Sequence, residues 1–315
     1  MATEMVTHVS DPQVRAPLGI IGGSGFYSLF DDATPVDVYT PFGTPSEAVL
    51  VGHIGDLPVA FLPRHGKGHR FAPHRVNYRA NLWALRAVGV RQVVAPCAVG
   101  SLLPHQGPGT LVVPDQIIDR TWGRPHTYYE RDGEVLHVAF ADPYCPRGRA
   151  AAVAAARAVP GHGDGGDGGD GGDGLGSGGS AHGDPAHGGG SVVDGGTLVV
   201  INGPRFSTRA ESRSYAAAGA TVIGMTTMPE AALARELAMC FTTVCLVTDL
   251  DAGVEVDAGV TQAEVFELFA ANMPRVKSVV ARTAAALGAH AENVAAGCGC
   301  RKALDGIDVP FDLPG

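Results

Sequence analysis

The chain has 315 residues, of which 45% are hydrophobic and 17% are charged, and its formal net charge is −9. This composition supports a large buried core, and the negative charge excludes a general nucleic-acid-binding surface. No apolar run approaches the roughly 18 residues of a membrane span. Residues 1–17 lack the apolar segment of a secretory signal, so we expect a flexible polar lead and a cytoplasmic protein.

The first half of the chain alternates apolar strand-like runs with helical periodicity. A short strand before a glycine turn opens it, and a hairpin-like return leads into a basic loop. A helix ending near Gly89 follows, and then two further strands. The corresponding sequences are LGIIG, GDLPVAFLPRHG, VNYRANLWALRAVGV, RQVVAPCAVGSL and GTLVVPDQIID.

The second half continues this alternation. It reads as strand, helix, strand, helix and strand, and a long helix over about 261–288 ends it. The pattern predicts a single α/β domain over 18–290, with a central mixed, largely parallel sheet flanked by helices. Sites in such sheets form from loops at the carboxyl ends of strands. Turns that follow the predicted strands are therefore candidates for one shared pocket.

One segment interrupts this domain. Residues 160–196 are rich in Gly and Asp and cannot bury apolar surface, so we expect a disordered loop. The Gly-Asp repeat lacks the apolar position that packs the turns of calcium-binding glycine-aspartate repeats. Residues 291–315 are expected to form a C-terminal tail.

The glycine turn at 20–27, IIGGSGFY, fits none of the common phosphate-loop or nucleophile-elbow patterns. It still exposes backbone N–H groups beside the hydroxyl of Ser24, as an anion-binding nest does. A tight structural turn explains the same residues equally well.

A basic segment over 62–81 contains five Lys or Arg residues, three His residues and no acid. It predicts a local positive field for a small anion, with Arg64 able to grip phosphate through two hydrogen bonds. A solvated basic surface is the alternative for most of these residues. The spacing of the histidines does not fit helical zinc ligation.

Later turns add further candidates. The strand end at Cys97 and Ala98 exposes backbone amides. Phe206 and Ser207 lie at a strand-to-helix turn, where the aromatic ring either covers a planar ligand or fills the core. Met225 and Thr226 precede Pro229, which suits a helix start and a second anion-binding feature.

Two acids, Asp249 and Asp251, follow an apolar strand directly. Residues two apart on an extended chain point to the same side, so the two carboxylates should share one face. A calcium loop is rejected because the fifth and twelfth positions counted from Asp249 are Gly253 and Val260. No neighbouring His or Cys suits a transition metal.

Six cysteines are scattered along the chain: Cys97, Cys145, Cys240, Cys245, Cys298 and Cys300. This distribution favours reduced thiols. The C-x-C pair at 298–300 can bind metal or oxidise, but no second Cys or His pair completes a zinc site. Ordinary thiols and no metal site are therefore expected.

Taken together, the motifs GIIGGSGFY, TPFGTPS, RHGKGH, VNYRANLWAL, DQIIDRTWGRPHTYY, DPYCP, GPRFSTRAESR and MTTMPEAALARE…VTDLDAG resemble the trimeric purine nucleoside phosphorylase family. Within it they are similar to the 5′-methylthioadenosine phosphorylase branch. The resemblance covers about 18–155 and 197–290 in the same order. It implies phosphorolysis, in which phosphate attacks C1′ of a purine nucleoside and displaces the base.

The resemblance also implies roles for individual residues. Met225 would lie against the ribose, and Phe206 and Ser207 beside the base. Asp249 would face N7 and the 6-substituent of the purine, with Asp251 as a supporting catalytic neighbour. His137 would reach the 5′ end of the substrate in a neighbouring subunit. The phosphate site would comprise Ser24, Arg64, His65, Cys97, Ala98 and Thr226.

The identity of the purine depends on few residues. The branches that act on 6-oxopurines resemble one another in having Asn at the strand end, where this chain has Asp249, and often Glu where it has Ser207. A carboxyl group matches a 6-amino group and N7 together, which favours adenine as the base. Cys97 departs from the pattern, because a Thr hydroxyl often binds phosphate there.

Other functions stay open at this point. They are a 6-oxopurine nucleoside or methylthioinosine phosphorylase, and a non-catalytic nucleoside- or anion-binding protein. The resemblance implies a homotrimer, phosphate as co-substrate and neither cofactor nor metal. It implies no nucleic-acid or membrane partner.

Overall fold

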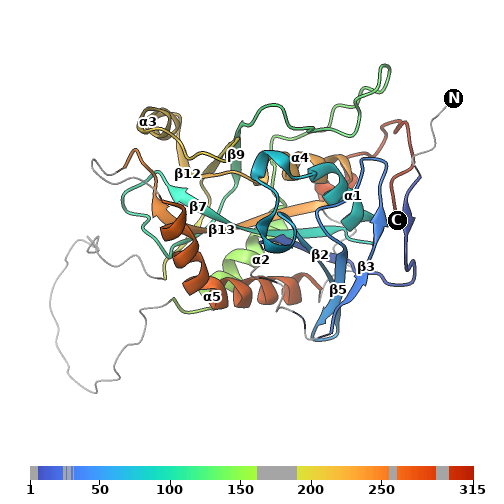
Figure 1. Cartoon of the computed structure of the whole chain (residues 1–315), viewed down its shortest axis with the longest axis horizontal. Coiled ribbons are helices and arrows are strands. Elements are labelled where there is room, and N and C mark those ends of the chain that lie inside the picture. Colours follow the sequence, from blue (N-terminus) through green and yellow to red (C-terminus); the bar gives the residue numbers. More distant parts are fainter. Residues whose placement is uncertain are drawn as a thin grey trace.

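The computed structural model describes residues 6–23, 26, 30, 32–161, 190–254, 261–288 and 298–315. Within these residues an 11-stranded sheet forms the centre of the fold (Figure 1). Its main path runs through β10 (Val192–Asp194), β8 (Leu111–Val113), β13 (Cys240–Leu250), β7 (Gln92–Ser101), β2 (Leu18–Gly22), β6 (Leu57–Pro63), β5 (Val49–Ile54) and β3 (Thr34–Val36). A branch adds β11 (Thr197–Ile201), β12 (Ala220–Gly224) and β9 (Gln116–Arg120).

The sheet is mixed and largely parallel, as predicted. β13, β7, β2 and β6 pair in parallel, whereas β5 pairs with β6 and with β3 in antiparallel fashion. The parallel strands are buried almost throughout, which fits their continuous apolar sequences. β1 (His8–Val9) and β4 (Val38–Tyr39) form a separate pair.

Helices cover both faces of the sheet (Figure 1). α1 (Tyr78–Ala87) and α4 (Thr227–Glu236) pack over one hydrophobic cluster, and α2 (Pro146–Arg157) and α5 (Gln262–Gly288) over the other. α3 (Arg209–Ala217) begins with a capping box formed by Thr208 and Glu211. α5 contains an internal proline, Pro274. No helix in the described ranges is long and apolar enough to span a membrane.

Several elements differ from the sequence-based expectation. The single strand predicted over 109–119 is two strands, β8 and β9, with Pro114 between them, where the ring leaves no N–H for the ladder. β10 lies inside the range 160–196 that we expected to be a loop, and it pairs with β8. Residues 162–189 lie outside the described part. The Ala-rich helix α2 was not predicted.

The C-terminal segment also differs from a simple tail. Its described part, 298–315, includes the short helix η4 (Gly299–Lys302) and packs against the body of the protein. Phe311 stacks on Tyr129 with 5.0 Å between ring centroids. Arg86 of α1 donates to the carbonyl oxygen of Pro314 at 2.9 Å. This end of the chain is therefore tied to α1.

Candidate active site

A cavity of about 800 Å³ lies where the turns after β2, β6, β11 and β12 meet the end of β13 and the interior of β7, and α5 closes one side. This is the position expected for a ligand site in an α/β sheet. The following predicted residues line it: Arg64, His65, Cys97, Ala98, Phe206, Ser207, Met225, Thr226, Asp249 and Asp251. The predicted strand end at Cys97 and Ala98 is wrong, because both residues lie inside β7, which continues to Ser101.

Two predicted residues are not part of this set. Ser24 lies outside the described residues, although Gly23 immediately before it lines the cavity. His137 is exposed, and it lies in a segment without helix or strand that extends from the body (green in Figure 1). His137 does not line the cavity of its own chain, and a role in a neighbouring subunit stays a prediction.

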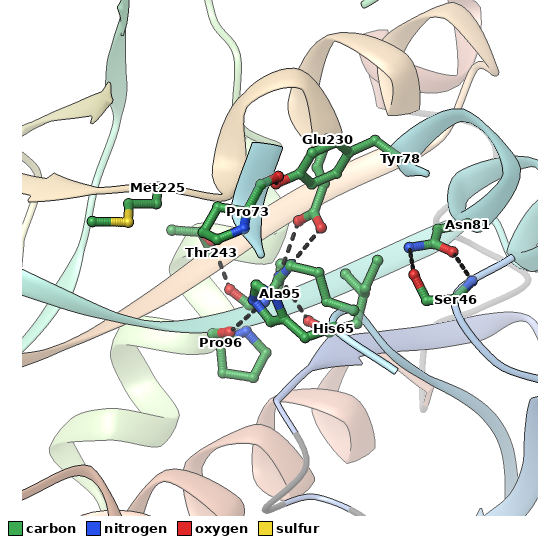
Figure 2. Close-up of polar contacts among 12 residues, drawn as sticks. Ser46, His65, Pro73, Tyr78, Asn81, Ala95, Pro96, Met225, Glu230 and Thr243 are labelled. Carbon is green, nitrogen blue, oxygen red and sulfur yellow. Dashed lines mark hydrogen bonds and ion pairs between the residues drawn. The ribbon is translucent and has the colours of Figure 1, made fainter. Parts of the chain in front are cut away.

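Arg64 follows β6 and is buried beneath α4. Its Nε and Nη2 atoms donate to the two carboxylate oxygens of Glu230 at 2.5 and 2.9 Å (Figure 2). Nη2 also donates to the carbonyl oxygen of Ile21 at 3.0 Å. Burial alone would lower the pKa of Arg64, but the Glu230 carboxylate more than offsets this and the pKa is raised. The guanidinium is therefore held rigidly. Nη1 makes only a long hydrogen bond, 3.5 Å, to the carbonyl oxygen of Pro96, so it is the nitrogen best able to donate to an anion in the cavity.

His65 is a neutral hydrogen-bonding group. Its Nδ1 lies 2.8 Å from the carbonyl oxygen of Phe71, so Nδ1 carries the proton and Nε2 is left as an acceptor. Burial, together with the charge of Arg64, lowers its pKa from 6.5 to about 3. The ring stacks on His69 at 4.1 Å between centroids. His65 can therefore accept a hydrogen bond from an O–H group of a ligand, and it adds no positive charge to the cavity.

The basic loop that carries these residues is anchored to α1. Arg70 donates to the carbonyl oxygen of Ser46 at 2.8 Å. Ser46 in turn pairs with Asn81, whose Oδ1 accepts from the Ser46 backbone N–H at 2.7 Å (Figure 2). Arg79 binds Glu130 at 2.5 Å. Arg70 therefore stabilises the loop, and Arg79 forms an ion pair at the surface.

The start of α4 departs from the expected helix start. Thr226 is the N-cap, but its hydroxyl makes no capping bond, and Met228 has extended backbone angles. The regular helix therefore begins only after Met228, and the first-turn amides are not aligned with Thr226. Buried Arg124 supports this segment by donating to the carbonyl oxygens of Met225 at 2.9 Å and Met228 at 2.6 Å. The Thr226 hydroxyl lines the cavity and makes no capping bond, so it can donate to an anion there.

Asp249 faces the cavity from the end of β13. The register with β7 shifts between Val247 and Asp249, which turns the carboxylate toward Gly100. A Cβ at Gly100 would lie 2.8 Å from Asp249 Oδ1, so any other residue at this position would displace the carboxylate. Thr248 Oγ1 donates to Asp249 Oδ2 at 2.8 Å. Burial, with repulsion from Asp251, raises the pKa of Asp249 from 3.8 to about 6.

Asp251 shares the cavity face with Asp249, as the strand spacing predicted. It is buried, and its carboxylate accepts hydrogen bonds from Ser207 Oγ, at 3.0 and 3.1 Å, and from Ser212 Oγ of α3. These bonds tie the end of β13 to α3. Asp251 and Ser207 therefore position the wall of the cavity and have little hydrogen-bonding capacity left for a ligand.

The remaining wall is apolar. Met225 and Phe206 contribute from the turns after β12 and β11. The first half of α5 adds a second apolar surface formed by Val265, Phe266, Phe269, Ala270 and Met273. The cavity thus combines an anion-binding end at Arg64 and His65, a polar end at Asp249 and an apolar side. This arrangement suits a ligand with a planar base and an apolar substituent.

Comparison with known proteins agrees with this geometry. The sequence profile of the phosphorylase superfamily matches residues 17–287. The chain is 52% identical to a purine nucleoside phosphorylase of Streptomyces coelicolor, over 96% of this chain and 99% of that one. It is also 52% identical to an S-methyl-5′-thioadenosine phosphorylase of Mycolicibacterium smegmatis, over 94% and 99%.

Solved structures give the same result. A methylthioadenosine phosphorylase from Schistosoma mansoni, in complex with adenine, has a TM-score of 0.73 and 36% identity, over 87% of this chain and 93% of that one. The chain therefore belongs to the phosphorylase superfamily. Within that superfamily it is similar to purine nucleoside and methylthioadenosine phosphorylases, and the sequence-based resemblance is confirmed.

Proposed function

We propose that the protein catalyses phosphorolysis of S-methyl-5′-thioadenosine, releasing adenine and 5-methylthioribose 1-phosphate. The observation that carries the proposal is the pairing of Asp249, whose pKa is about 6, with the apolar wall from α5 in one cavity. Asp249 can form hydrogen bonds with the purine, and the apolar residues of α5 can contact an apolar 5′ substituent. The similarity to curated methylthioadenosine phosphorylases supports the same reaction.

In this reaction a phosphate oxygen bonds to C1′ while the bond from C1′ to N9 breaks. Arg64 Nη1 and the Thr226 hydroxyl donate to phosphate, and His65 Nε2 accepts from its O–H. Cys97 and Ala98 line the same end, with Ala98 offering backbone rather than side-chain contact. Ser24, which lies outside the described residues, completes the proposed set. Holding the nucleophile against C1′ supplies much of the rate acceleration.

The departing purine takes the electron pair of the broken bond. A protonated Asp249 donates its O–H to N7 and accepts a hydrogen bond from the 6-amino group with its other oxygen. Negative charge developing on the base strengthens the donated bond, which can end as proton transfer. Phe206 packs on the base, and Met225 contacts the ribose. No cofactor or metal takes part, and phosphate is a co-substrate.

A second candidate is phosphorolysis of a 6-oxopurine nucleoside or of methylthioinosine, because one relative is named purine nucleoside phosphorylase. A product assay separates the candidates. Methylthioadenosine, adenosine, methylthioinosine and inosine are each incubated with and without phosphate. We expect phosphate-dependent adenine release, fastest from methylthioadenosine. Dominant hypoxanthine release would favour the second candidate, and binding without any release would indicate a non-catalytic binding protein.

The pH dependence of kcat/KM tests the role of Asp249. Its protonated form is the active one, so kcat/KM should fall as the pH rises through about 6, the pKa of this group in the free protein. Phosphate ionises in a nearby range. The Asp249→Asn variant is therefore measured alongside, because it retains the phosphate ionisation and lacks that of Asp249. An identical profile in both proteins would contradict the assignment.

We further propose a homotrimer in which His137 enters the site of a neighbouring subunit. Trp122 and Val135 are each 75% exposed, and Val135 lies in the same extended segment as His137. A second copy covering this segment would remove both apolar side chains from water. Light scattering should give the mass of three chains, and a monomer with full activity would contradict the proposal. The cytoplasmic location stays a prediction.

A further inference from the structure

Four cysteines from three separate parts of the chain meet at one point. Cys145 precedes α2, Cys240 begins β13, and Cys298 and Cys300 belong to the C-terminal segment. All four are buried, and their sulfur atoms lie within 4.8 Å of one another. Cys298 Sγ lies 3.5 Å from the Sγ atoms of both Cys145 and Cys240.

The premise that the C-x-C motif lacks a second pair is therefore wrong. The two further thiols are distant in sequence, and only the fold brings them to the motif. A sequence motif detects two ligands only when they are close together in the chain. Cys145 and Cys240 are far apart in the sequence, so no motif detects them.

The dimensions of the cluster match one tetrahedral ion. A Zn–S bond of about 2.3 Å places the sulfurs of a tetrahedron about 3.8 Å apart. The separations of 3.5 Å and the upper limit of 4.8 Å bracket this value. Such a space has no room for the several iron and sulfide atoms of an iron–sulfur cluster. Four sulfur donors in tetrahedral order are typical of a structural zinc site.

The surroundings favour thiolates over thiols. Cys145 is the N-cap of the 12-residue helix α2, so its sulfur lies at the positive end of the helix dipole. Arg235 Nη2 lies 3.9 Å from Cys300 Sγ. That guanidinium is fixed by bonds to the carbonyl oxygens of Ala139 and Asp142 at 2.7 and 2.6 Å. Four thiolates around a divalent ion carry a net charge of −2, which Arg235 partly balances.

We propose that Cys145, Cys240, Cys298 and Cys300 bind one Zn²⁺ ion with a structural role. The ion joins the C-terminal segment to the starts of α2 and β13. None of these cysteines is among the described residues that line the cavity. Asp249 lies nine residues beyond Cys240 on the same strand, which is roughly 30 Å at 3.3 Å per residue. The site therefore acts on stability and not on the reacting atoms.

The test measures metal content in the full chain, purified without a metal-affinity step under reducing conditions with zinc present. After dialysis, elemental analysis should find one zinc per chain. The double variant Cys298→Ala/Cys300→Ala should lose that zinc. Cys245→Ala is the matched control, because Cys245 is an equally buried cysteine outside the cluster, 3.6 Å from Cys97 Sγ, and its variant should keep the zinc.

A second measurement on the unaltered chain does not depend on how the variants fold. Stripping the metal with a chelator and adding Co²⁺ should produce the visible absorption of a tetrahedral cobalt–thiolate complex. The stripped chain should melt at a lower temperature and keep phosphate-dependent turnover below that temperature. Absence of bound metal would overturn the proposal. Disulfides among the four cysteines, detected by intact mass without reductant, would also overturn it. Iron in place of zinc would overturn the assignment of the ion.

Discussion

Replacing Asp249 by Asn is expected to lower kcat/KM for methylthioadenosine by about 10²- to 10⁴-fold, the usual worth of a general acid. The amide keeps the size of the side chain but loses the acidic proton that N7 receives. Its N–H₂ group also faces the 6-amino group, which is itself a donor. The same change should lower the ratio of kcat/KM for methylthioadenosine to kcat/KM for 6-oxopurine nucleosides, because O6 and N7 of a 6-oxopurine are both acceptors. Initial rates with each substrate at saturating phosphate measure both effects.

The fold should survive this substitution. Burial raises the pKa of Asp249 above its value in the unfolded chain, so the ionised carboxylate opposes folding above about pH 6. Asn removes that cost, and the melting temperature at pH 8 should equal or exceed that of the parent. Asp251→Asn is the comparison variant, because Asp251 accepts hydrogen bonds from serine hydroxyls. In this variant kcat/KM should still fall as the pH rises through the pKa of Asp249. An unchanged rate in Asp249→Asn would remove the basis for adenine specificity.

The second large effect is expected for Glu230→Ala, which leaves the buried guanidinium of Arg64 without its carboxylate partner. Breaking a buried ion pair from one side costs about 3–5 kcal/mol, because the remaining charge is uncompensated. The free energy of unfolding should fall by this amount in urea titrations at fixed protein concentration. KM for phosphate should rise as well, since Arg64 loses the two bonds that fix its plane.

The chain offers a matched control for this prediction. Arg79 and Glu130 form an equally short ion pair, but Glu130 is 48% exposed. Glu130→Ala should cost no more than about 1 kcal/mol, as surface pairs do, and should leave KM for phosphate unchanged. Similar losses of stability in the two variants would show that burial does not set the strength of the Arg64–Glu230 pair.

Local patterns predicted the central strands of the sheet and many of the residues that line the cavity, but not the apolar wall contributed by α5. Asp249 lies at the end of β13, and Met225 and Thr226 follow the end of β12; the strand ends of such a sheet meet at one edge. The family resemblance then assigned a role to each of them. Alternation of strands and helices gave the sheet type, because parallel strands require crossover helices.

Partners distant in sequence were not predictable in this way. Glu230 and Arg64 are 166 positions apart, and no local signal marks Glu230 as the partner of a buried arginine. Arg124 likewise forms hydrogen bonds with Met225 and Met228, which are 101 and 104 positions away in the sequence. The cysteine cluster was missed for the same reason. Charged residues with no nearby partner, inside motifs that are otherwise apolar, are the signal that could have found Glu230.

Pro274 of α5 has a consequence for the size of the substrate. The residues of this helix that line the cavity end at Met273, and residues beyond the proline, such as Val276 and Val279, are buried in the core. Proline has no N–H, so the carbonyl of Ala270, itself in the cavity wall, lacks its helical partner. The two halves of the helix are thus joined by a weakened turn. A shift of the first half can widen or narrow the cavity for different 5′ groups while the second half stays packed in the core.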